Sequence, residues 1–183
     1  AGLRHRGYPG AAFLGTGAEV DPASDTVRLF LVVDSGPLYR VGEVRVEGLE
    51  RTPASAVTNL RPFGFGEPFT EKMLLDYQEA LQKSGLYEGV AVELELDPER
   101  ADRAVVVARL REQKLQTATV GIGFSSNTGP RIGLEHTHRR LFGHDLVGSS
   151  RIRLGRSERE FAFDLLTYPQ ERGYRNLLAV RAD

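Results

Sequence analysis

Few residues of this sequence suggest a reactive or metal-binding site, and the strongest candidates are histidines. His136 and His138 lie two positions apart, directly after Glu135 and shortly before His144. The two imidazole groups on one face of a strand, with Glu135 and His144 near, could bind a divalent metal ion. The two histidines also share the parity of the apolar residues before them. Their rings can therefore continue the apolar strand face and keep their polar nitrogen atoms near water at the end of the strand. We favour this interpretation and expect no metal site.

Other catalytic patterns are missing from the sequence. The serines at 125–126 and 149–150 lie in turn or strand patterns without a positioned base. Glu93 and Glu95 share a strand face, which is ordinary for solvated carboxylates. The glycine-rich segment 64–69 lacks the lysine and the hydroxyl residue of a phosphate loop. We therefore expect no enzyme activity and no cofactor.

Composition limits the function classes further. The 183 residues are 40% hydrophobic and 27% charged, which is typical of a globular chain. The net charge is -1, and the basic residues are not interspersed with aromatic ones, so the sequence gives no argument for nucleic-acid binding. The absence of cysteine excludes disulfides and cysteine-ligated metals. No apolar run is long enough for a transmembrane helix, which leaves short alternating strands as a route across a bilayer.

The elements that would position these residues are strands. Between residues 117 and 124, apolar residues alternate with small or polar ones, and the alternation resumes at Ile132 and Leu134 after a turn at 125–130. This pattern is expected of a strand with lipid or core on one side and a wet lumen on the other. The apolar residues are Ala118, Val120, Ile122 and Phe124, and those opposite are Thr117, Thr119, Gly121 and Gly123.

Helical periodicity does not return after Lys114. The strands that follow are close to the about 9–11 residues that cross a bilayer when tilted. A soluble β-meander would alternate in the same way, so periodicity alone leaves both interpretations open. The predicted strands are 117–125, 131–140, 146–156, 159–168 and 176–183.

One stretch decides between the two. VGIGFSSNTGPRIGLEHTHRRLFG, at 120–143, resembles the first barrel hairpin of the BamA/TamA superfamily of outer-membrane assembly factors. Its Gly-x-Gly-aromatic strand, S-x-x-TGPR turn and L-F-G-x-D turn are most similar to the TamA branch. The resemblance implies that residues 115–183 are roughly the first four to five antiparallel strands of a transmembrane β-barrel.

Residues 36–114 form a predicted α+β module with the order β-α-α-β-β. Thr52 is predicted to cap a short helix, and Thr70 a second helix that ends at Gly85. Leu74, Tyr77 and Leu81 would form the apolar face of this second helix. The order of elements, and the opening GPLYRVGEVRVEGL, resemble a POTRA domain, the periplasmic module of the superfamily.

A similar hairpin occurs twice. Gly7 and Gly85 each precede a strand, an Asp-Pro turn at Asp21 or Asp97, and a second strand. Chance likeness of two hairpins is the alternative, since hairpins share turn chemistry. We favour tandem modules, which makes residues 1–35 the C-terminal part of a preceding POTRA domain. The chain begins at the end of an element and stops inside a strand, so we expect a fragment of a longer protein.

The resemblance implies a non-enzymatic outer-membrane factor that assists the insertion or secretion of β-barrel proteins and autotransporters. Its POTRA domains would lie in the periplasm, and a TamB-like inner-membrane partner is implied likewise. Unfolded clients could add to a POTRA sheet edge or to the first barrel strand through main-chain hydrogen bonds. The alternative is a passive polypeptide-translocating pore of the two-partner-secretion or chloroplast import type.

The candidate site residues follow from these two hypotheses. An assembly factor would use the first barrel strand, where glycines weaken local packing. A pore would depend more on basic residues of the lumen or rim. The client-binding candidates are Thr117, Thr119, Gly121, Gly123 and Phe124, and the basic candidates are Arg131, Arg151 and Arg153.

Overall fold

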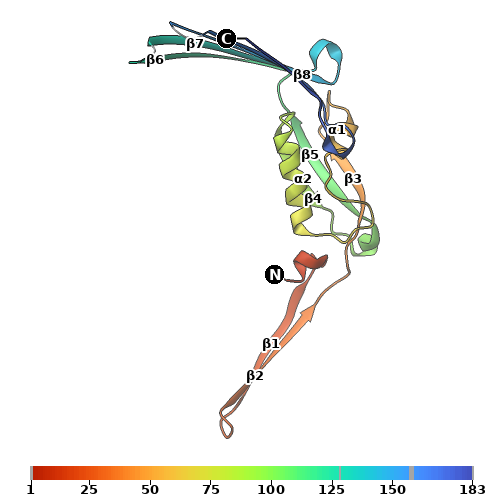
Figure 1. Ribbon diagram of the computed structural model, residues 1–183. Coiled ribbons are helices and arrows are strands. Elements are labelled where there is room, and N and C mark those ends of the chain that lie inside the picture. The colour runs from red at the N-terminus through yellow and green to blue at the C-terminus, as the bar shows by residue number, and fades with distance from the viewer. Residues whose placement is uncertain (1, 128, 157–158, 183) are drawn as a thin grey trace. The chain divides into compact units, whose positions relative to one another are not determined.

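The computed structural model describes residues 2–127, 129–156 and 159–182 (Figure 1). Thr128, Ser157 and Glu158 of the predicted turns, and Asp183 of the last predicted strand, lie outside the described residues. In the described ranges no helix has the length and apolar character to cross a membrane. The chain divides into two compact units, Ala1–Glu47 with Pro62–Glu79 and Ala91–Arg109, and Gly48–Arg61 with Ala80–Val90 and Leu110–Asp183.

The first unit begins with the short helix η1 (Arg4–Arg6) and a hairpin of β1 (Ala12–Asp21) and β2 (Thr26–Asp34). The hairpin turn closes where the Asp21 carboxylate accepts a hydrogen bond from the Ala23 N–H at 3.0 Å. Asp97 accepts from Glu99 N–H at 3.0 Å in the same way. The two turns therefore share their chemistry, whereas the assignment of residues 1–35 to a preceding POTRA domain stays a prediction.

The next elements have the predicted order β-α-α-β-β. Their strands form a three-stranded sheet of order β3-β5-β4, in which β3 and β5 run parallel. A parallel pair requires a long crossover, and the two helices supply it. The elements are β3 (Val41–Glu47), α1 (Ala54–Thr58), α2 (Glu71–Lys83), β4 (Tyr87–Leu94), η2 (Pro98–Arg103) and β5 (Ala104–Glu112).

Two of the three predicted helix boundaries are confirmed. The Thr70 hydroxyl accepts from the Met73 N–H at 3.2 Å and so caps α2. Gly85 has a φ of +72°, the left-handed conformation that ends a helix. The prediction for Thr52 was wrong, because Pro53 is the N-cap of α1 and no side chain caps this helix. The Thr52 N–H instead donates to the Glu112 carboxylate at 2.7 Å.

Helix α2 buries the predicted apolar face. Tyr77 and Leu81 are fully buried, and Leu74 packs against the core cluster of Tyr39, Phe69, Ala101 and Ala104. The Phe63 ring meets the Tyr77 ring edge to face with centroids 5.5 Å apart, an arrangement that aromatic pairs favour. Burial on one face explains why this short helix is stable in the chain.

Truncation of Leu81 is expected to be costly. We expect residues 36–114 to fold alone as a domain. Leu81→Ala should lower the free energy of unfolding of this domain by about 2–5 kcal/mol, because Leu81 is fully buried. Leu75→Ala makes the same chemical change on the same helix at a residue that is 61% exposed, and should cost less than about 0.5 kcal/mol. Urea titration followed by circular dichroism measures both. Equal losses in the two variants would contradict the assigned helix face.

The second unit contains an antiparallel five-stranded sheet of order β10-β9-β8-β7-β6 (Figure 1). All five predicted strands are confirmed to within a few residues at their ends. Short turns η3 (Leu141–Gly143) and η4 (Glu171–Gly173) join neighbouring strands. The strands are β6 (Gln116–Ser125), β7 (Gly129–Arg139), β8 (Leu146–Gly155), β9 (Arg159–Thr167) and β10 (Leu177–Ala182).

Candidate functional site

The register of the five-stranded sheet sorts its residues onto two faces. On one face Val120 lies opposite Leu134, Leu134 opposite Ile152, and Ile152 opposite Phe161. This face is highly exposed, with Ile122 at 86% and Phe124 at 79%. An exposed apolar patch that spans several strands marks a surface that contacts a membrane or another protein. The predicted alternation is thus observed, and Phe124 belongs to its apolar side.

The opposite face is polar and carries charges in pairs. Arg151 donates to Glu135 at 2.7 Å and Arg153 to Glu160 at 3.0 Å. Arg181 reaches Asp164 at 3.3 Å, so three neighbouring strand pairs are bridged. The candidates Arg151 and Arg153 therefore lie on this face but are already neutralised by carboxylates. The acidic partners were missed in the sequence because they depend on strand register.

Arg131 differs from the other two basic candidates. No ion pair of Arg131 occurs within the described ranges, and its side chain lies over Gly123. A Cβ at Gly123 would come within 3.0 Å of the Arg131 Nε, so the glycine makes room for the guanidinium. A hollow of about 530 Å³ lies here on β6, β7 and β8. Its lining includes Thr119, Gly121, Gly123, Arg131, Glu135 and Arg153.

Strand β6 is an edge of this sheet, since in the described part of the chain it pairs with β7 alone. In an antiparallel ladder, residues alternate between those that exchange hydrogen bonds with the partner strand and those whose N–H and C=O point away from it. The Arg139 N–H donates to the Leu115 carbonyl at 2.8 Å. This pair extends the β6–β7 register by one residue, so it identifies which residues are bonded.

The alternation directs the backbone of Thr117, Thr119, Gly121 and Gly123 towards β7. The side chains of these client-binding candidates lie together on the polar face, but their backbone N–H groups are used in pairing with β7. In the described part of the chain, the amides that face the outer edge of β6 belong to Ala118, Val120, Ile122 and Phe124. Phe124 alone of the candidates combines an edge-facing amide with a side chain on the apolar face.

The histidines continue the apolar face, as expected. His136 lies opposite Ala118 and Ser150, and the His136 and His138 ring centroids are 6.5 Å apart. Within the described ranges, no group of three or more His, Cys, Asp or Glu residues could hold a metal ion.

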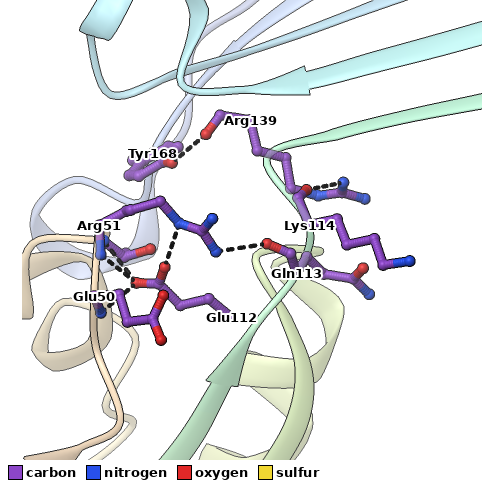
Figure 2. Close-up of polar contacts among 8 residues, drawn as sticks. Glu50, Arg51, Glu112, Gln113, Lys114, Arg139 and Tyr168 are labelled. Carbon is purple, nitrogen blue, oxygen red and sulfur yellow. Dashed lines mark hydrogen bonds and ion pairs between the residues drawn. The ribbon is translucent and has the colours of Figure 1, made fainter.

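A second polar cluster surrounds the end of β5, where the chain leaves the α+β module. The Glu112 carboxylate accepts from the N–H groups of Glu50, Arg51 and Thr52 at 3.1, 3.0 and 2.7 Å. Its other oxygen accepts from the Arg51 Nε at 2.9 Å, and the Arg51 Nη2 donates to the Gln113 carbonyl at 3.1 Å. Figure 2 shows these contacts converging on the Glu112 side chain, which is only 4% exposed.

The titration of Glu112 reflects this environment. Burial acts to raise the pKa of its carboxyl group, but the hydrogen bonds from the Arg51 and Thr52 backbone and from the Arg51 guanidinium outweigh it. The pKa falls from its ordinary 4.5 to about 2. Glu112 is therefore charged at neutral pH and holds the loop before α1 against the end of β5.

Sequence reasoning missed this cluster and the arginines next to it. Glu112 stands in a charged run, Arg111 to Lys114, that predicts only a solvated strand end. Arg139 stands beside Arg140 with no local signal that separates the two. Only contacts between segments distant in the sequence identify these residues.

Comparison with known proteins gives the class of these elements. Residues 39–113 match the family POTRA, "Surface antigen variable number repeat". The structure of BamA from Haemophilus ducreyi lacking POTRA domains 1-3 is 18% identical, with a TM-score of 0.69 over 94% of this chain and 32% of that one. CdiB from Escherichia coli is 19% identical, with a TM-score of 0.56 over 93% and 31%. CdiB from Acinetobacter baumannii is 12% identical, with a TM-score of 0.52 over 89% and 31%.

These identities establish a shared fold, and the chain spans about a third of the length of each of these structures. Residues 39–113 are a POTRA domain, and the antiparallel strands that follow resemble in fold the start of a BamA barrel. The predicted fold, a POTRA module followed by barrel-like strands, is therefore confirmed, and it is shared with BamA and CdiB. The narrower similarity to the TamA branch stays a prediction, since these matches are to BamA and CdiB.

Proposed function

We propose that the chain belongs to a non-enzymatic outer-membrane factor that assists the insertion or secretion of β-barrel proteins and autotransporters. The observation that carries this proposal is the two-faced sheet. One face is apolar and exposed across its strands, the other is charged and paired, and β6 leaves one edge open. A sheet of this kind suits a bilayer on one side and a wet lumen on the other.

The proposed mechanism is β-augmentation, in which an extended client adds a strand to an exposed edge. Main-chain hydrogen bonds do not depend on client sequence, so one edge can serve many clients. The outward amides of Ala118, Val120 and Ile122 would donate to the client. The outer strand β4 of the POTRA sheet offers a second edge. The start of β3 is less available, because the Val41 N–H already donates to Glu67 O at 3.0 Å.

The surroundings of the protein follow from the same proposal. The sheet would lie in the outer membrane and the POTRA domain in the periplasm, where unfolded clients arrive. Nucleic acid is not a proposed partner. A TamB-like inner-membrane partner rests on the sequence resemblance to the TamA branch alone.

A passive polypeptide-translocating pore is the second candidate, favoured by the charged face of the sheet. In a pore, the client would pass along the lumen, where Arg131 stands without an ion pair in the described ranges. The two candidates differ in which residues a client in transit contacts.

Cysteine crosslinking to a stalled client in the intact protein separates the candidates. We expect capture at Thr119→Cys and Gly121→Cys on the edge strand, because a client strand paired with β6 lies within reach of both positions. Arg153→Cys, two strands further into the sheet, should capture little. Capture at Arg153→Cys with none along β6 would favour the pore.

A further inference from the structure

Two arginines of the sheet region reach the C-terminal end of helix α2. The Arg139 Nε donates to the Gly85 carbonyl at 3.0 Å, and the Arg175 Nη1 donates to the Ser84 carbonyl at 3.0 Å. The last carbonyls of a helix lack partners within the helix and carry its partial negative charge. Ser84 and Gly85 directly follow Lys83, the last residue of α2, so the two guanidinium groups lie where this partial negative charge gathers.

Arg139 binds more than the helix end. Its Nη1 donates to the Lys114 carbonyl at 2.9 Å and to the Thr117 hydroxyl at 3.0 Å. Its backbone N–H donates to Leu115 O at 2.8 Å, and its carbonyl accepts from the Tyr168 hydroxyl at 2.9 Å. Figure 2 shows Arg139 between Lys114 and Tyr168. Arg139 thus connects the end of α2, the linker that follows β5, and Thr117 near the start of β6.

Arg175 is fastened to the sheet in a similar way. Its Nε donates to the Thr167 carbonyl at the end of β9 at 2.8 Å. A guanidinium can hold two acceptors in a fixed geometry, which a lysine ammonium on a flexible stem does less well. Asn59 adds another side-chain contact between the helical part and the sheet part of this unit, since its Nδ2 donates to the Pro169 carbonyl at 3.1 Å.

We propose that Arg139 is a positioning residue that, together with Arg175, locks the end of helix α2 to the linker at 113–115 and the start of β6. The lock fixes the first residues of the edge strand to the POTRA segment at 84–86. When the segment at 84–86 moves, the start of the edge strand therefore moves with it, because the arginine side chains hold the two together across the linker. This inference concerns joints within the second compact unit and stands independently of what β6 binds.

Hydrogen–deuterium exchange of the intact protein in lipid nanodiscs tests the lock. Arg139→Lys keeps the charge but loses the planar guanidinium. It should raise exchange of the hydrogen-bonded amides within 113–119 by about tenfold or more, because hydrogen bonds to charged groups oppose local opening. Arg175→Met should raise exchange at 84–86. Arg172→Gln removes an exposed arginine of the η4 turn, for which the described residues provide no partner, and should change neither region.

Amides in the middle of β8, around Ile152, separate a local lock from general destabilisation. They should exchange at unchanged rates in every variant. Unchanged exchange at 113–119 in Arg139→Lys would overturn the proposal, and so would an equal rise at 113–119 and in β8. If Arg139→Met is prepared as a stronger variant and fails to fold, Arg139→Lys and Thr117→Val, which removes one acceptor of Arg139, still decide the question.

Discussion

Glu112→Gln is expected to lower the free energy of unfolding of the isolated domain, residues 36–114, by about 3–5 kcal/mol at neutral pH. The carboxylate accepts four hydrogen bonds from the loop 50–52 and is 4% exposed. Glutamine has nearly the same size, but its amide group would turn N–H donors towards N–H donors. The Arg51 guanidinium would also lose its charged partner.

A matched control distinguishes this cluster from an ordinary surface pair. Glu88 accepts from the Arg111 Nε at 2.7 Å, but Arg111 is 75% exposed and Glu88 37% exposed. Glu88→Gln should cost less than about 1 kcal/mol, as exposed ion pairs usually do. Chemical denaturation of the two variants and the parent domain measures the difference. Equal costs would mean that the loop contacts of Glu112 add nothing to stability.

Glu112 also predicts how stability depends on pH. Its pKa is about 2 when folded and 4.5 otherwise, so between these values the unfolded chain binds the additional proton. The contribution of Glu112 is therefore complete above about pH 4.5 and is lost as the pH falls towards 2. The shift corresponds to about 3 kcal/mol. The stability gap between the parent domain and Glu112→Gln should narrow over this range, and a constant gap would contradict the assignment.

Val120→Pro is expected to reduce client capture about three- to tenfold while the sheet still folds, because it removes one outward donor. Proline is tolerated in an edge strand when its missing N–H faced away from the sheet. Gly121→Pro removes an amide that faces β7, so it should instead lower the folded fraction. Crosslinking from Thr119→Cys measures capture, and heat-modifiable gel mobility measures folding.

The comparison of neighbouring prolines makes this test specific. Val120→Ala keeps the amide and should capture a client as the parent does. A folded Val120→Pro protein that captures normally would contradict edge pairing through β6. A Val120→Pro protein that fails to fold while Gly121→Pro folds would show that the assignment of outward amides is reversed.

The local structure of this protein could be predicted from its sequence. Alternation predicted the two faces of β6, since successive side chains of a strand point to opposite sides whatever surrounds it. Thr70 and Gly85 predicted the ends of α2, because a cap acts within one turn of the backbone. The β-α-α-β-β order and the succession of strands followed from such local signals, whereas the likeness to a POTRA domain came from a family resemblance.

The contacts between distant residues could be identified only in the folded chain. Thr52 carries the local signal of a helix cap, yet its N–H is bound by Glu112. Strand register, not side-chain type, pairs Arg151 with Glu135 and selects the amides that face outward from β6. Arg139 and Arg140 are alike in sequence, but Arg139 reaches the end of α2. Periodicity and caps belong to the backbone over a few residues, whereas these contacts form only when distant segments come together in the folded chain.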